Sequence, residues 1–155
     1  MHEKDAWKFL RTPAGKYPHD RIQRIENVTA DGMPDINGCI GGVEFWIELK
    51  CPRMPKREST PIFGSGHPIM PNQFAWANKQ RIAGGNSFYL ICFDEETILL
   101  DGWKTHPDCL KMNKKELIQV SCYHADLRID KCWEMVRLTI YTIGINRMNE
   151  KIGNE

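Results

Sequence analysis

Three residues in the first third of the chain have the types and spacing of a metal-assisted hydrolytic site. Asp35 precedes a short apolar segment, and Glu48 and Lys50 follow this segment with one residue between them. Carboxylates suit a hard divalent cation such as Mg²⁺ or Mn²⁺. Such a cation polarises a phosphoryl oxygen and activates water, while an ammonium group stabilises the charge of the transition state. This set predicts hydrolysis of a phosphodiester bond.

A β-hairpin is the element that would bring these groups together. The pair Gly41-Gly42 tolerates the positive φ angles that a tight hairpin turn requires. With this turn, Ile36 faces Ile47 and Asp35 faces Glu48. Like charges that face each other across a strand pair are destabilising, so the two carboxylates predict a cation between them.

The order of these features resembles the PD-(D/E)xK nuclease superfamily. Pro34-Asp35, the hairpin and Glu48-Leu49-Lys50 match the two parts of its motif. The segment Met70 to Trp76, then Gly84-Gly85 and an apolar strand, resembles the glutamine-bearing helix of its VRR-NUC and Holliday-junction-resolvase-like branch. The resemblance covers residues 20 to 100 and implies an α/β fold with a restriction-endonuclease-like core, a mixed central β-sheet flanked by helices.

The resemblance also implies roles for individual residues. Asp35 and Glu48 would bind Mg²⁺ or Mn²⁺ together with the backbone carbonyl of Leu49. Lys50 would orient the attacking water and stabilise the developing charge, and Gln73 would support Lys50.

Relatives often carry one more acidic ligand upstream of the Pro-Asp pair. Glu26 and Glu3 are the two candidates in this chain. We favour Glu26, which lies nine residues before Asp35 on an expected neighbouring strand. For either residue, the alternative is an exposed surface carboxylate.

DNA is the substrate that the resemblance implies. Several small relatives cut branched DNA as homodimers, so structure-selective cleavage by a homodimer is one expectation, and a phage origin is another. The expected contacts to DNA phosphates are basic residues in a proline- and glycine-rich loop and in the following helix: Arg53, Lys56, Arg57, Lys79 and Arg81. A merely solvated surface loop is the alternative.

The elements before residue 101 can be assigned from spacing. Residues 2–11 predict a helix that ends before Thr12-Pro13, because the residue before proline avoids the helical region. Prolines and glycines exclude regular structure from Cys51 to Ile69. The other expected elements are a strand from Arg21 to Thr29, a helix from Pro71 to Ile82 or Ala83, and strands at residues 86–93 and 96–100.

The last third of the chain is less determined by its sequence. Residues 101–113 predict a loop and residues 114–120 favour a helix, whereas residues 131–143 fit a helix or a strand. Residues 146–155 are expected to form a flexible tail after a single domain at residues 1–145.

Composition narrows the class of protein. No segment approaches the ~20 apolar residues of a membrane span and no signal segment is visible, so a cytoplasmic protein is expected. The six cysteines show neither a CxxC pair nor zinc-finger spacing and fit reduced structural thiols. The net charge of +1 does not by itself indicate nucleic-acid binding.

Two other function classes stay open. The fold could serve as a catalytically silent module that binds nucleic acid or protein, because one fold hosts many functions. The chain could also be an interaction protein that uses its tryptophans as contacts. A silent module has no need for opposed carboxylates beside a lysine, and this favours the enzyme.

Overall fold

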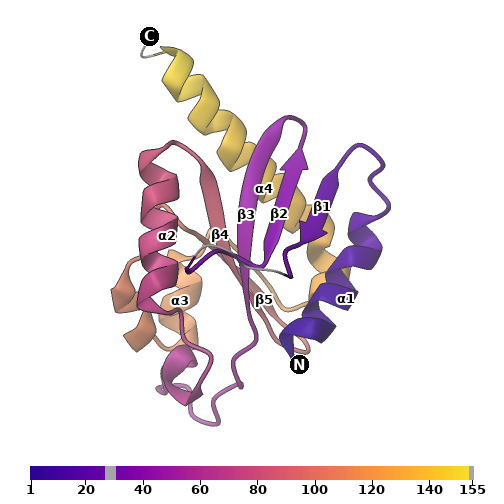
Figure 1. The fold of residues 1–155 in the computed structure, drawn as a ribbon. Coiled ribbons are helices and arrows are strands. Elements are labelled where there is room, and N and C mark those ends of the chain that lie inside the picture. Colours follow the sequence, from indigo (N-terminus) through magenta and orange to yellow (C-terminus); the bar gives the residue numbers. More distant parts are fainter. Residues whose placement is uncertain (27–30, 154–155) are drawn as a thin grey trace.

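A six-stranded mixed β-sheet forms the centre of the computed structural model, which describes residues 1–26 and 31–153 (Figure 1). The strands lie side by side in the order in which they occur in the chain. β3 and β4 are parallel, and each other neighbouring pair is antiparallel. The strands are β1 (Arg21–Arg24), β2 (Ile36–Ile40), β3 (Val43–Lys50), β4 (Asn86–Cys92), β5 (Thr97–Asp101) and β6 (Tyr123–Ala125).

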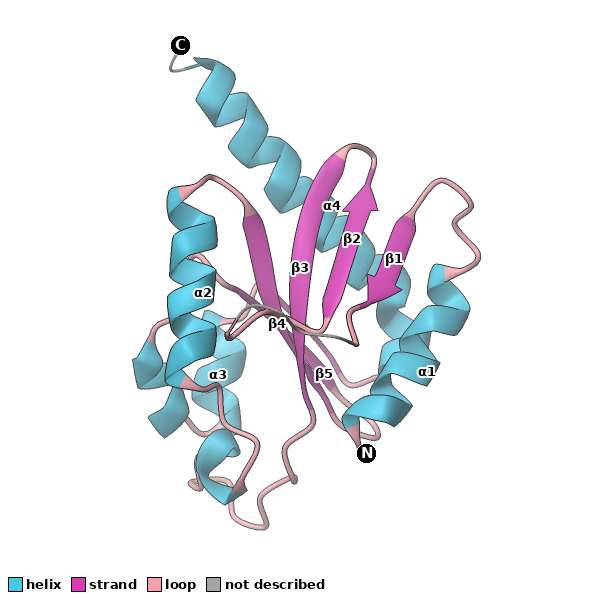
Figure 2. Cartoon of the chain, viewed as in Figure 1, coloured by secondary structure: helices cyan, strands magenta, loops and turns pink. Residues whose placement is uncertain are grey.

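Helices cover both faces of this sheet (Figure 2). Side chains of α1 and α4 are buried against one face, and side chains of α2 and α3 are buried against the other. The predicted α/β architecture with a mixed, helix-flanked sheet is therefore confirmed. The helices are α1 (Glu3–Ala14), α2 (Pro71–Ile82), α3 (Lys114–Val120) and α4 (Ile129–Gly153), with short 3₁₀ helices η1 (Ile62–Ser65) and η2 (Pro107–Lys111).

The hairpin of β2 and β3 has the predicted register. Ile36 pairs with Ile47 and Ile40 pairs with Val43. Both residues of Gly41-Gly42 have positive φ, 55° and 85°, as the tight turn requires. The pairing is therefore fixed by the turn and by the burial of one apolar face.

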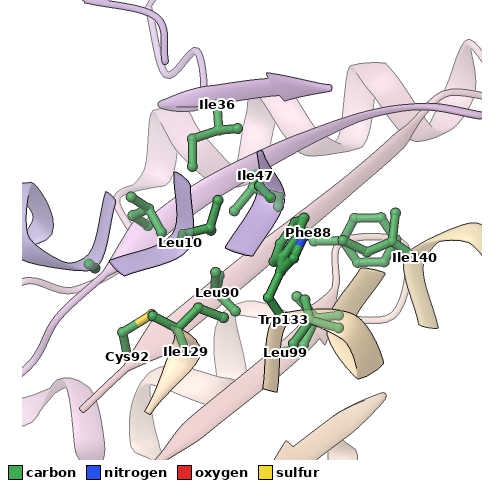
Figure 3. Packing of buried hydrophobic residues seen from close by; sticks show 14 of the residues in the cluster. Leu10, Ile36, Ile47, Phe88, Leu90, Cys92, Leu99, Ile129, Trp133 and Ile140 are labelled. Atoms are coloured by element: carbon green, nitrogen blue, oxygen red, sulfur yellow. The ribbon is translucent and has the colours of Figure 1, made fainter. Parts of the chain in front are cut away.

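The larger hydrophobic core lies between the sheet and helices α1 and α4 (Figure 3). Leu10 of α1 and Trp133 of α4 meet Ile47 of β3 and Phe88 of β4 in this core, and all four are at most 1% exposed. β3 pairs with a strand on each side, and one of its faces packs against α1 and α4. The polar residues on its other face are therefore held in place.

Helix α1 continues through Pro13 to Ala14, so the prediction that it ends before Thr12 is wrong. A proline in the last turn removes only one intrahelical hydrogen bond. Ala14 is buried in the core, and the Gly15 N–H donates to the Arg11 carbonyl at 3.0 Å. Core packing therefore outweighs the local preference.

Helix α4 continues through residues 146–153, where the sequence predicts a flexible tail. Arg147 is buried there, donates to the carboxylate of Asp101 and to Asn86, and lies 3.8 Å from the ring centre of Trp103. These partners are distant in the sequence. The correction therefore comes from tertiary contacts that no local pattern indicates.

Three further expectations are refined. β1 ends at Arg24, and residues 27–29 of the expected strand lie outside the described residues. The ambiguous segment 131–143 is helical, and the three-residue strand β6 was not predicted. In the part of the chain that the structure describes, no helix has the length and apolar character of a membrane span.

Candidate active site

Asp35 and Glu48 lie together at the open end of the β2–β3 hairpin. Ile36 pairs with Ile47, so the adjacent residues Asp35 and Glu48 take opposed positions. Asp35 Oδ2 accepts a hydrogen bond from the backbone N–H of Leu49 at 2.9 Å. Asp35 lies one residue before β2 begins. The hydrogen bond therefore holds the Asp35 carboxylate against β3 just beyond the paired part of the hairpin.

The environment of the two acids disfavours their negative charges. Burial, and then the nearby Asp35 carboxylate, raises the pKa of Glu48 to about 8. Burial also raises the pKa of Asp35, although the Leu49 N–H and the Lys50 ammonium partly offset this effect. A bound cation would relieve both the desolvation and the repulsion.

Lys50 and Gln73 surround one oxygen of Glu48. The Lys50 ammonium lies 3.3 Å from Glu48 Oε1, and the Gln73 amide donates to the same oxygen. Gln73 Oε1 accepts the Met70 N–H at 2.8 Å, which fixes the orientation of the amide. Gln73 was predicted to support Lys50, but its direct contact is to Glu48.

The second oxygen of Glu48 is the open position of this site. Within the described residues, Oε2 is buried and has no hydrogen-bond partner. Buried carboxylate oxygens normally have a partner, so an unpartnered one fits a missing ligand. An oxygen donor set from Asp35, Glu48 and the Leu49 carbonyl suits Mg²⁺ or Mn²⁺.

Glu3, in the first turn of α1, is the additional acid whose charge interacts with this pair. Burial and then the charge of Asp35 raise the pKa of Glu3, and Glu3 in turn contributes to the raised pKa of Glu48. Glu26, which the sequence favoured, is exposed. Within the described residues, Glu26 is not among the groups that shift these pKa values.

Two positive groups near the site were not predicted. Burial raises the pKa values of Glu3 and Asp35, and the charge of Arg24 partly offsets this effect for both acids. His67 also lowers the pKa of Glu3. Arg24 of β1 pairs with Ile36, the residue after Asp35. If the sequence had defined the register of β1, it would have indicated that Arg24 lies near the site. His67 comes from the irregular loop after β3, for which the sequence gives no position.

The basic residues predicted to contact DNA are exposed but do not form one cluster: Arg53, Lys56, Arg57, Lys79 and Arg81. Arg53 lines a pocket of about 740 Å³ together with His67 and with Cys51, the residue after Lys50. Arg81 lines a different pocket, of about 460 Å³, beside Trp103. Neither pocket is lined by Asp35, Glu48 or Lys50, so within the described residues none of these five basic residues shares a pocket with the two acids.

No protein-family model matches the chain, and a comparison with curated protein sequences finds no match. Among solved structures, the chain is similar to Hjc, a Holliday junction resolvase from the archaeal hyperthermophile Archaeoglobus fulgidus. The TM-score is 0.48 at 14% sequence identity, and the similarity covers 83% of this chain and 94% of that chain. By itself this likeness assigns no function to the chain.

Proposed function

We propose that this chain is a metal-dependent nuclease of the PD-(D/E)xK type that hydrolyses phosphodiester bonds in DNA. The observation that carries the proposal is the buried pair of Asp35 and Glu48 beside Lys50, with Glu48 Oε2 left unpartnered. Buried carboxylates that face each other are costly for a fold, so their presence beside a buried lysine supports a catalytic use.

In this proposal, Asp35 and Glu48 hold Mg²⁺ or Mn²⁺, and the Leu49 carbonyl and Glu3 add oxygen ligands. The bound ion would polarise the phosphoryl group and lower the pKa of a bound water. Glu3 takes the place of Glu26 because its charge acts on Asp35 and Glu48, whereas Glu26 is exposed.

The neighbouring side chains prepare this site. Gln73 donates to Glu48 Oε1 and so directs Oε2 toward the ligand position. The Lys50 side chain is 7% exposed, and its ammonium lies close to Glu48, from where it can hydrogen-bond the attacking water or a phosphoryl oxygen. Its low exposure strengthens its interaction with developing negative charge.

Branched DNA cut by a homodimer is the finer form of this proposal. It is supported by the order of motifs in the sequence and by the exposed basic residues of the loop that directly follows Lys50 at the end of β3. Cations on an exposed loop bind phosphates without reading sequence, which suits recognition of DNA shape.

The test is cleavage of linear duplex, single-stranded and four-way-junction DNA with Mg²⁺ or Mn²⁺. We expect metal-dependent cutting that Asp35→Asn and Lys50→Ala abolish. Glu44→Gln is a matched control, because Glu44 is exposed on β3 four residues before Glu48. A wild-type protein that cuts none of these substrates contradicts the proposal, and DNA binding without cutting would favour the silent binding module.

A further inference from the structure

We propose that Glu96, His124 and Asp126 form a second metal site, for a divalent transition-metal ion such as Zn²⁺. One ligand atom of each residue lies within 4.8 Å of the other two. In residues 1–26 and 31–153, this is the one trio of His, Cys, Asp or Glu side chains that meets this condition. The trio is separated from the candidate active site by β4 and does not depend on the proposed nuclease function.

The register of the sheet brings the two carboxylates together. Thr97 of β5 pairs with Ala125 of β6, so the adjacent residues Glu96 and Asp126 take opposed positions. His124 lies two residues before Asp126, and alternate residues of a strand share a face. These opposed carboxylates at the end of the β5–β6 strand pair repeat the arrangement of Asp35 and Glu48 at the end of the β2–β3 pair, and they again need a positive charge between them.

His124 places its imidazole at the point where that charge is needed. Its Nε2 lies 2.7 Å from Glu96 Oε2 and 3.5 Å from Asp126 Oδ1. A hydrogen on Nε2 therefore faces both carboxylates. A metal ion that takes the place of this hydrogen would meet one imidazole nitrogen and two carboxylate oxygens, and the neutral ring would keep its hydrogen on Nδ1.

The ligand set and its exposure fit a bound ion with open coordination positions. An imidazole with two carboxylates favours Zn²⁺ over Mg²⁺, which prefers oxygen ligands alone. The Glu96 side chain is 9% exposed and that of Asp126 is 88% exposed. The buried Glu96 would be a ligand that the fold holds in place, and the exposed Asp126 leaves the site open for the ion to enter from solvent.

Lys114 is the cation that competes for this site. Its ammonium lies 3.0 Å from Glu96 Oε1, and its side chain is 41% exposed, so it can turn into solvent. Removing the ammonium should therefore tighten metal binding. A purely structural network of ion pairs would instead be weakened by the same change and would bind no metal.

The test uses the full chain with Asp35→Asn and Glu48→Gln, so that the first site cannot contribute. Equilibrium dialysis with Zn²⁺, followed by metal analysis, should show one saturable equivalent per chain. Adding Lys114→Met should tighten this binding, and adding Asp126→Asn should weaken it by at least roughly tenfold, the loss that even an outer partner of a ligand can cause. Asp126 is exposed, so this variant is expected to fold.

Co²⁺ provides an independent readout, because its absorption spectrum distinguishes nitrogen and oxygen ligands from thiolates. We expect visible bands without sulfur-to-cobalt charge transfer, and their loss with His124→Ala. The absence of saturable Zn²⁺ binding, binding that Asp126→Asn and His124→Ala leave unchanged, or a thiolate spectrum would each overturn the inference.

Discussion

Gln73 of α2 donates a hydrogen bond to Oε1 of Glu48 on β3, across a separation of 25 residues in the chain. The same amide accepts the Met70 N–H at the start of α2. This one side chain thus caps the start of α2, positions the Glu48 carboxylate and joins α2 to β3.

Replacing Gln73 should reveal this positioning role. With Gln73→Ala, we expect a loss of kcat of roughly tenfold or more with little change in KM, because misplacing a ligand mainly affects the transition state. The lost cap should also cost about 1 kcal/mol of stability. Steady-state cleavage and urea unfolding measure the two effects.

Gln119→Ala is the matched control for this variant, because Gln119 is exposed on α3. Equal cleavage by the Gln73→Ala variant and the wild type would show that Glu48 keeps its position without the amide.

The metal-free protein should lose stability as the pH rises. The pKa of Glu48 is raised by burial, and then by Asp35, from 4.5 to about 8. Between these values the unfolded chain releases a proton that the folded chain keeps, so the free energy of unfolding falls with increasing pH. Urea unfolding in EDTA at pH 5, 6, 7 and 8 measures this slope.

In the proposed function, Mg²⁺ should reduce this slope, because the ion would bind the ionised carboxylates of the folded state. Glu48→Gln should also flatten it, because the amide does not titrate. A slope of the opposite sign in EDTA would mean that Glu48 is ionised and stabilised in the folded chain.

Glu3 and Glu26 should differ in their effect on metal use. Glu3→Gln should raise the Mg²⁺ concentration needed for half-maximal cleavage, because Glu3 lies close enough to Asp35 for their charges to interact. Glu26→Gln should leave the Mg²⁺ titration unchanged, since Glu26 is exposed. The reverse result would restore the assignment that the sequence favoured.

Arg147 should be essential to the stability of α4. Arg147→Met leaves the buried Asp101 carboxylate without its partner, and breaking a buried ion pair costs about 3–5 kcal/mol. Urea unfolding measures the loss, and adding Asp101→Asn should recover part of it. A loss below about 1 kcal/mol, the range of exposed ion pairs, would favour the flexible tail that the sequence predicts.

The local part of the site was predictable from the sequence, and the rest depends on tertiary contacts. Asp35, Glu48 and Lys50 belong to one hairpin, whose turn and alternation fix the register. Glu3 and Gln73 arrive from helices whose placement on the sheet no spacing reveals.

Helix α4 shows why part of the fold could not be assigned. Val136 and Ile140 are buried against the sheet, whereas Met135 and Leu138 point to solvent and are 51% and 40% exposed. Apolar residues on two sides of a helix erase the single helical period on which assignment depends. The segment therefore fitted a strand equally well.

The order of the strands also has a consequence for how the chain folds. Because β2 and β3 are joined by two residues, Asp35 and Glu48 can meet before α2 delivers Gln73 to them. The two carboxylates would then repel each other in the transition state for folding. We therefore expect Mg²⁺ to accelerate refolding, and Glu48→Gln to make the refolding rate independent of the ion.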